Sequence, residues 1–486
     1  MNSIKFLYKS INTINGIINI IFIMKILIFS SPFLGHLNVL DYFMNQFAQT
    51  HEIKLVITSW KNIKSNIIIN ENVIILEHDN IKSSNPMIFT LNRVFNLTGK
   101  CIEICKDFKP HLIIYDFFSI EGFITAKNMS IPCFCSIPAM IGPYKNNNHF
   151  VLNLHNDKNI KYINKIIKSY NVNLLENNIQ QVSDGMLVPS DVNILWSYSK
   201  IIECDDYLEN RYLLKNNFVI VGPRTINTIN TINTINTINT IKKIIYVSFG
   251  TVVSQNLWNC NKTVQYFVNY VYNIIISIFK DNKDFDIVIA TNRKDLPIKW
   301  PSNFIIYEHV DQLNMLSKTH IFITHCGGNS FNESILNNVP MIGIPFFGDQ
   351  HLIAQKINKL NVGVSFLHDS EQYDQYTNTE NNPYFRETLT KFNLELAIEN
   401  IHNNHQKFVK NINDINDINN ENNDISRILK KYHNYPINWK NGDLLYGTNK
   451  DRISKLLTMM IILEYASIYH FQNYMMINVM KLYFQE

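Results

Sequence analysis

The chain has 486 residues, with 44 Lys and Arg against 40 Asp and Glu, so its formal charge is only +4. A hydrophobic content of 46% and an aromatic content of 12% exclude a chain that is disordered as a whole. Because the charges nearly balance, there is no global electrostatic reason to expect a nucleic-acid partner. Any ligand has to be inferred from a site.

Residues 1–23 are interpreted as an N-terminal extension or a weak signal-like segment, because lysines precede an apolar run but no small-residue cleavage site follows. Met1 and Met24 are both candidate starts. The run is shorter than the roughly 20 apolar residues that span a bilayer, so we expect no firm membrane anchor. Seven sparse cysteines without CxxC pairs indicate a reducing compartment. The predicted location is cytoplasmic, with the secretory pathway as the alternative if 1–23 act as a signal.

Short runs rich in Ile and Val alternate with longer amphipathic stretches such as 40–49. Near-continuous apolar runs are typical of parallel strands that are buried on both faces. The runs interpreted as strands are 25–30, 53–58, 111–115, 131–137 and 218–221, and then 243–249, 285–290, 304–307, 320–324, 341–345 and 362–366. The restart of the rhythm predicts an α/β fold of two tandem Rossmann-like domains, each doubly wound around a parallel sheet.

Between the two series, Thr-Ile-Asn is repeated from Thr225 to Ile241. A period of three matches neither helix nor strand, so this tract is interpreted as a flexible linker. The predicted segments are an extension at 1–23, a first α/β domain at 24–224, the repeat linker at 225–242, a second α/β domain at 243–410, an Asn-rich low-complexity tract at 411–423 and a tail at 424–486.

In open α/β sheets, ligands bind beyond the carboxyl ends of the strands. Gly35 and His36 follow the first predicted strand and open a helix. An imidazole at a helix N-terminus tends to stay neutral and can act as a base, although a histidine there can also simply cap or pack. Asp116 ends a later strand, where it can hold that imidazole in its useful tautomer or merely cap a helix.

The second half carries more polar residues at strand ends. Thr251 follows its first strand and offers a phosphate contact. His325 ends a later strand, and the helix that begins after two glycines turns bare N–H groups toward an anion. Glu333 lies one turn further on, where a carboxylate can take both hydroxyls of a ribose. The remaining candidates at these strand ends are Gly327, Gly328, Asn329, Ser330, Asp349 and Gln350.

Six motifs occur in the chain in this order: SPFLGHLN, IIYDFF, FVIVGP, IIYVSFGT, FITHCGGNSFNES and VPMIGIPFFGDQ. In this order and spacing they resemble the UDP-glycosyltransferase family, whose fold is the two-domain GT-B fold with a cleft between the domains. The resemblance implies inverting transfer of a sugar from a UDP-sugar to a hydroxyl of a small hydrophobic acceptor. It implies no metal and no cofactor beyond the UDP-sugar co-substrate.

The resemblance implies that 24–224 is the acceptor-binding domain and 243–410 the UDP-sugar-binding domain, and it assigns a role to each matching position. His36 would be the general base and Asp116 its partner. The contacts to the diphosphate of the donor would be Thr251, His325, Asn329 and Ser330, beside Gly327 and Gly328. Glu333 would contact the ribose, and Asp349 and Gln350 would contact the hydroxyls of the sugar. His309, Val310 and Gln312 would lie beside the uracil.

Two departures accompany the resemblance. Where the family often has Trp-x-Pro-Gln beside the uracil, this chain has His309 and Asp311, so a smaller ring must stack and the rigidity of proline is lost. Glu121 is expected near the acceptor side. The altered residues and the repeat tracts leave a second reading open, a degenerate protein that binds a nucleotide sugar without turnover. A third reading, a UDP-sugar epimerase, shares the architecture but lacks the Gly-His and Asp-Gln motifs.

Overall fold

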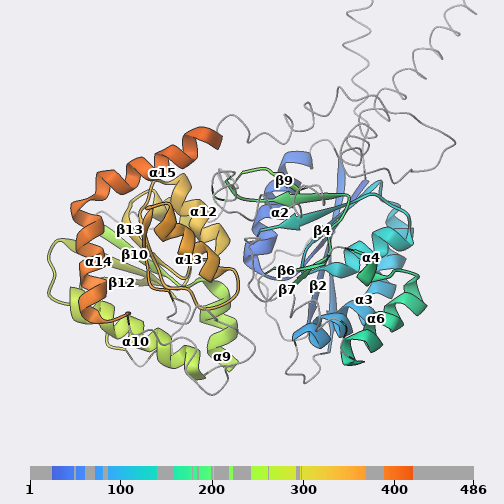
Figure 1. Cartoon of the computed structure of the whole chain (residues 1–486), viewed down its shortest axis with the longest axis horizontal. Coiled ribbons are helices and arrows are strands. Elements are labelled where there is room, and N and C mark those ends of the chain that lie inside the picture. Colours follow the sequence, from blue (N-terminus) through green and yellow to red (C-terminus); the bar gives the residue numbers. More distant parts are fainter. Residues whose placement is uncertain are drawn as a thin grey trace, which may run out of the picture.

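The structure, a computed structural model, describes residues 25–48, 51–60, 72–79, 86–138, 155, 157–177, 179–182, 185–198, 201, 218–222, 242–260, 262–291, 296, 298–367 and 388–419. They form an N-terminal and a C-terminal α/β half that lie side by side (Figure 1). The predicted extension at 1–23, nearly all of the predicted linker at 225–242 and the predicted tail at 424–486 lie outside the described residues.

The N-terminal half is built on a seven-stranded parallel sheet in the order β3-β2-β1-β4-β5-β8-β9. Along β1, Ile26 and Ile28 lie in one hydrophobic cluster and Leu27 and Phe29 in another. Both faces of the strand are therefore buried, which explains why its sequence is a continuous apolar run. The strands are β1 Lys25–Ser30, β2 Glu52–Trp60, β3 Val73–His78, β4 Leu112–Asp116, β5 Cys133–Ile137, β8 Val192–Leu195 and β9 Phe218–Ile220.

The other elements of this half are helices on the sheet and a short antiparallel hairpin. They are α2 Leu34–Phe47, α3 Pro86–Phe108, α4 Ile120–Asn128, α6 Asp157–Tyr170, the 3-10 helix η1 Leu174–Glu176, and the hairpin strands β6 Gln180–Val182 and β7 Gly185–Leu187. None of the described helices, in either half, is long and apolar enough to cross a membrane.

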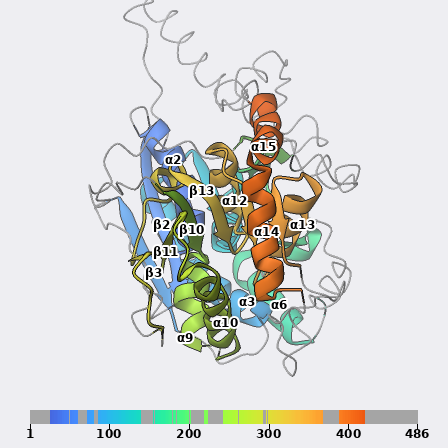
Figure 2. The same cartoon turned by 90° about the vertical axis from the view of Figure 1, so that its left-hand side faces the viewer.

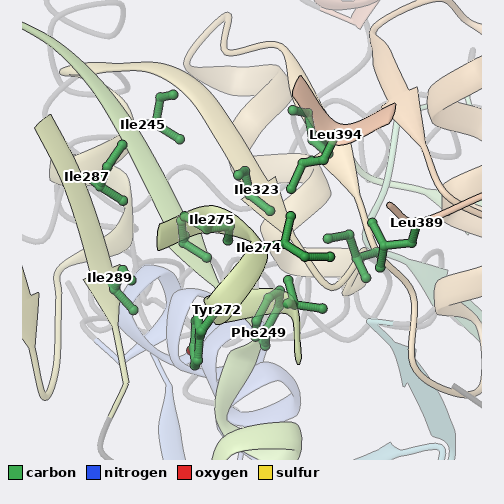
Figure 3. Close-up of a cluster of buried hydrophobic side chains, with 14 of the residues drawn as sticks. Ile245, Phe249, Tyr272, Ile274, Ile275, Ile287, Ile289, Ile323, Leu389 and Leu394 are labelled. Carbon is green, nitrogen blue, oxygen red and sulfur yellow. The ribbon is translucent and has the colours of Figure 1, made fainter. Parts of the chain in front are cut away.

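The C-terminal half repeats the plan with a six-stranded parallel sheet in the order β12-β11-β10-β13-β14-β15. Side chains from β10, β11, β13 and the helices α10 and α14 meet in one buried cluster, where Ile245, Ile287 and Ile323 face Ile275 and Leu394 (Figure 3). The strands are β10 Lys243–Ser248, β11 Phe285–Ala290, β12 Phe304–Tyr307, β13 Thr319–Thr324, β14 Met341–Gly343 and β15 Gly363–Ser365.

The helices of this half are the π-helix η2 Val252–Leu257, α9 Trp258–Cys260, α10 Lys262–Phe279, α11 Gln312–Leu316, α12 Gly328–Leu336, α13 Gln350–Lys359, α14 Lys391–Asn403 and α15 His405–Asn419. The two parallel sheets with helices on both faces confirm the predicted fold class of two tandem Rossmann-like domains.

The Asn-rich tract at 411–423 is interpreted from its sequence as a separator between a domain and a tail. In the structure, residues 411–419 form the second part of α15. Ile412 and Ile415 are three residues apart, so they share a helix face, and both are buried. Asn416 Nδ2 donates to the carbonyl of Ile335 at the end of α12, at 2.8 Å. The tract thus packs on α12, and Figure 2 shows α14 and α15 running along the outside of this half.

Three histidines meet where β13 begins and α14 gives way to α15. His320 Nε2 lies 3.0 Å from His402 Nδ1, and the His320 and His405 rings stack at 3.9 Å. Burial, followed by the neighbouring His405 and Lys243, lowers the pKa of His320 to about 3, and burial also lowers the pKa of His402 and of His405. In the folded protein these rings therefore resist protonation.

This cluster predicts acid lability. Because the folded-state pKa of His320 lies below the unfolded value of 6.5, its stabilising contribution is complete above pH 6.5 and is lost as the pH falls toward 3. His320 is half-buried, so solvent screening leaves an effect on the order of 1 kcal/mol, or roughly 2–4 °C in Tm. His320→Gln should flatten the decline of Tm between pH 6.5 and 4.5, measured by calorimetry. The same substitution at the exposed His155 should leave this decline unchanged. An equal slope of Tm against pH in His320→Gln and in the unsubstituted chain would contradict the prediction.

Candidate active site

His36 and Asp116, predicted from separate strand ends, form a hydrogen-bonded pair. His36 is the third residue of α2, and its Nδ1 lies 2.7 Å from Oδ1 of Asp116, the last residue of β4. The Asp116 side chain is 1% exposed and that of His36 16%. Ser31, directly after β1, donates its hydroxyl to Asp116 Oδ2 at 2.7 Å, so both carboxylate oxygens have a partner. With Nδ1 bound to the carboxylate, Nε2 is the ring nitrogen that has no hydrogen-bond partner among the described residues.

Three phenylalanine rings surround the His36 imidazole. Phe117 stacks on it with 5.3 Å between ring centroids, and Phe118 and Phe33 lie at 5.1 Å and 5.7 Å. Phe117 is fully buried, whereas Phe33 and Phe118 are partly exposed. The imidazole therefore lies beside apolar aromatic surface that solvent still reaches.

The Phe118 position is fixed by a buried ion pair. Arg93 of α3 donates from Nε to Glu121 Oε1 at 2.7 Å and from Nη2 to Glu121 Oε2 at 3.3 Å. The same Nη2 donates to the carbonyl of Phe118. Both charged side chains are 0% exposed. Arg93 thus links Glu121 to the main chain of Phe118, whose ring lies beside His36.

On the donor side, His325 follows β13 and its ring lies against two glycines. A Cβ at Gly327 would come within 2.4 Å of His325 Nε2, and one at Gly250 within 2.6 Å of the ring, so neither position has room for a side chain. Gly250 also has φ +72°, a conformation that L-residues rarely adopt. Burial lowers the pKa of His325 to about 4, so the imidazole is neutral at pH 7.

Gln312, Ser330 and Glu333 meet between α11 and α12. Gln312 Nε2 donates to Ser330 Oγ at 3.0 Å and to Glu333 Oε2 at 2.7 Å, and its Oε1 accepts from the Tyr246 hydroxyl at 3.3 Å. Ser330 and Glu333 are buried. Asp311 caps α11 by accepting from Asn314 N at 3.3 Å, and its φ of −66° is the angle a proline would have.

The other predicted donor residues lie at the same strand ends with fewer visible partners. Thr251 begins the turn after Gly250 and precedes η2, His309 is exposed after β12, and Val310 packs on a buried cluster. Asp349 is buried just before α13. Gln350 uses its Oε1 within its own loop, accepting from Phe346 N at 2.8 Å and Phe347 N at 3.2 Å.

The two halves touch between these two groups of residues. Asn329 of α12 donates its Nδ2 to the carbonyl of Gly35 at 2.7 Å. Gly35 immediately precedes His36, so the dyad of one half lies next to the start of α12 in the other. In Figure 1, α12 lies on the side of the C-terminal half that faces α2.

The family described as UDP-glucoronosyl and UDP-glucosyl transferase matches residues 237–378, the segment that holds His325, α12 and Gln350. The C-terminal half of the chain is therefore similar to the UDP-glycosyltransferase family. NDP-glycosyltransferase YjiC of Bacillus subtilis is 26% identical over 288 residues, which cover 58% of this chain and 67% of that relative. The matches to further Bacillus relatives cover 64% and 65% of their lengths, so the chain spans about two thirds of these curated relatives.

Solved structures of glycosyltransferases share the fold of this chain. The glycotransferase of kitacinnamycin has a TM-score of 0.61 at 14% identity, covering 85% of this chain and 98% of that one. Spinosyn rhamnosyltransferase SpnG, complexed with thymidine diphosphate, has a TM-score of 0.58 at 11% identity, covering 85% and 100%. At such low identity the likeness shows the fold alone, and it confirms the predicted GT-B architecture.

Sequence reasoning missed four residues that contact the candidate site. Ser31 carries the same signal as the residues that were found, a hydroxyl directly after a strand, and applying that rule to β1 would have included it. Tyr246 lies inside a strand and its role depends on Gln312, 66 residues away. Arg93 and Phe33 gave no local signal, because their partners are distant or apolar.

Proposed function

We propose that this protein transfers a sugar from a UDP-sugar to a hydroxyl of a small hydrophobic acceptor, with inversion and without a metal ion. The observation that carries the proposal is the contact between the halves, where Asn329 of α12 binds the carbonyl beside His36. It places a His-Asp pair suited to proton removal next to a helix start suited to an anion. The match of residues 237–378 to the family model supports the same reaction class.

In the proposed reaction, His36 Nε2 removes the proton of the acceptor hydroxyl. The acceptor oxygen forms a bond to the anomeric carbon on the side opposite to UDP, the bond from that carbon to the diphosphate oxygen breaks, and UDP leaves with the electron pair. Asp116 holds the Nδ1–H tautomer through its 2.7 Å bond and stabilises the imidazolium as it forms.

In this proposal, hydrogen-bond donors rather than a metal ion stabilise the charge of the leaving diphosphate. The first N–H groups of α12 and the neutral His325 ring supply them, together with Ser330, Asn329 and Thr251. Glu333 accepts from the ribose hydroxyls, with Gln312 holding the carboxylate at 2.7 Å. Asp349 and Gln350 are assigned to the sugar hydroxyls, and His309 and Val310 to the uracil side.

The hydrophobic character of the acceptor follows from the surroundings of the base. Phe33 and Phe118 are partly exposed and each lies within 6 Å of the His36 ring, centroid to centroid. An aromatic or aliphatic ring placed against them would gain apolar contact and bring its hydroxyl toward Nε2.

The test is a calorimetric titration of the full chain with UDP in EDTA, followed by an acceptor screen with UDP-sugars. UDP should bind, and His325→Ala and Gly327→Ala should weaken binding by about 10–100-fold, the loss expected for a charge-assisted hydrogen bond. Gly327 has φ −67°, so alanine there strains no backbone and acts only through its Cβ against His325.

Gly99→Ala is the matched control, because a Cβ there makes only an ordinary 3.6 Å contact with the Tyr170 hydroxyl. Absence of UDP binding by the unsubstituted chain, or binding that requires a divalent ion, would refute the donor site. UDP binding without transfer to any acceptor would favour the degenerate binding protein instead.

A further inference from the structure

Helix α12 carries two polar faces with different partners. Ser330 and Glu333, one turn apart, bind Gln312 within the C-terminal half. Asn329 and Asn332, also one turn apart, both donate to main-chain carbonyls of the N-terminal half. Asn332 Nδ2 lies 2.8 Å from the carbonyl of Trp196, just after β8, in a buried contact.

From Trp196, hydrogen bonds continue to Phe117, the residue next to Asp116. The indole Nε1 donates to Ser136 Oγ at 2.9 Å, and Ser136 lies on β5, beside Asp116 in the sheet. The main-chain carbonyl of Ser136 accepts from Phe117 N at 3.1 Å. Two contacts of α12 therefore reach a neighbour of each member of the dyad, Gly35 beside His36 and, through Trp196 and Ser136, Phe117 beside Asp116.

The chain after Trp196 is anchored in the C-terminal half. Tyr198 and Ile201 are buried in the same cluster as Phe331 and Ile335 of α12. The end of β8 therefore belongs to the packing around α12, and a shift of α12 would move the Trp196 carbonyl and indole with it. The close packing of such a cluster transmits displacement rather than absorbing it.

Asn332 is not the residue that stability alone would favour. It is buried, and its Oδ1 has no hydrogen-bond partner among the described residues. An unsatisfied buried carbonyl costs free energy that an apolar side chain of similar size would avoid. Among the described residues, the one side-chain hydrogen bond that Asn332 makes is the bond across the two halves.

We propose that Asn332 and Trp196 are positioning residues that set the His36–Asp116 dyad relative to the donor helix α12. The proposal rests on the proposed sugar transfer and adds to it the means by which the base is aligned with the donor. Asn332 fixes the end of β8 against α12, and Trp196 passes that position to Ser136 on β5. Neither side chain is required to touch the substrate.

The experiment compares Asn332→Leu and Trp196→Phe with the unsubstituted chain. Asn332→Leu keeps the side-chain size and removes the bond to Trp196, and Trp196→Phe keeps an aromatic ring and removes the bond to Ser136. We expect kcat to fall about tenfold or more in each, because small misplacement of a base is costly, while donor KM and the UDP dissociation constant stay within about twofold. The double variant should be little worse than either single variant.

Asn337→Leu is the matched control. Asn337 Nδ2 donates a hydrogen bond to the Glu333 carbonyl at the end of α12, at 2.8 Å. The variant therefore loses a side-chain hydrogen bond to the same helix and leaves the contacts with the other half unchanged. A purely structural role for Asn332 would lower Tm and leave kcat per folded molecule unchanged. Equal kcat for Asn332→Leu and Asn337→Leu would overturn the proposal.

A second measurement does not depend on activity. Amide hydrogen exchange at Phe117 should quicken in Trp196→Phe and Asn332→Leu and stay unchanged in Asn337→Leu, because the Phe117 amide binds the Ser136 carbonyl. If the unsubstituted chain transfers no sugar, the proposed function fails while this exchange still decides the positioning role. Unchanged exchange in both variants would overturn that role.

Discussion

Replacing His36 by alanine is expected to lower sugar transfer by about 10²–10⁴-fold, the range for loss of a positioned general base. Asp116→Asn should cause a loss of similar order, because the amide cannot hold the Nδ1–H tautomer and stabilise the imidazolium as the carboxylate does at 2.7 Å. Single-turnover rates with saturating donor and acceptor measure both effects. Since neither residue belongs to the C-terminal half, UDP affinity should stay within about twofold.

His111→Ala is the control for removing a histidine from the same sheet. His111 precedes the first residue of β4, whereas Asp116 is the last residue of that strand. The His111 Nδ1 accepts a hydrogen bond from the Lys25 amide at 2.9 Å. This variant should retain full transfer. Transfer by His36→Ala at the rate of the unsubstituted protein would show that His36 is not the base.

The fold was largely predictable because its strands are buried on both faces. Continuous apolar runs such as those of β1 and β4 are distinctive, and the predicted bounds of β11 and β12 are those of the structure. The strands that were missed carry weaker signals. β3 is buried only in part, and β8 has just four residues and includes Asn193.

The Asn-rich tract shows where composition misleads. A repeat of Ile every third residue, read as low complexity, also places Ile412 and Ile415 on one helix face. Their burial against the cluster that contains Phe331 gives that face a partner. Composition describes which residues a segment has, whereas its structure depends on what the segment packs against.

The candidate site was predictable only in location, where side chains lie directly at strand ends, as those of His36, Asp116 and His325 do, and the roles of these residues stay predictions. Residues that position the site were not predictable, because each acts on a partner far away in the chain. Trp196 binds Ser136 over a separation of 60 residues, and Asn329 binds Gly35 over 294. Such pairings depend on how the two halves pack, which local pattern does not encode.

Breaking the buried pair of Arg93 and Glu121 is expected to destabilise the N-terminal half by about 3–5 kcal/mol. Glu121→Gln leaves a guanidinium that is 0% exposed without its carboxylate, and Arg93→Met leaves the carboxylate without its cation. The double variant Arg93→Met/Glu121→Leu should recover most of the loss, because it removes both charges and keeps the volume. Urea unfolding, followed by circular dichroism, measures the free energy of each variant.

The surface pair of Lys25 and Glu52 is the matched control, with side chains 39% and 50% exposed and 3.2 Å between Nζ and Oε2. Glu52→Gln should lower the free energy of unfolding by less than about 1 kcal/mol, because water already screens the attraction between these two exposed charges. A cost for Glu121→Gln no larger than this would contradict the prediction. The double variant separates the effect on stability from the effect on the position of Phe118. It should be stable, but it also loses the Arg93 hydrogen bond to the Phe118 carbonyl, so we expect it to transfer sugar more slowly. The pair then serves both to hold α3 against α4 and to keep an aromatic ring in place beside the base.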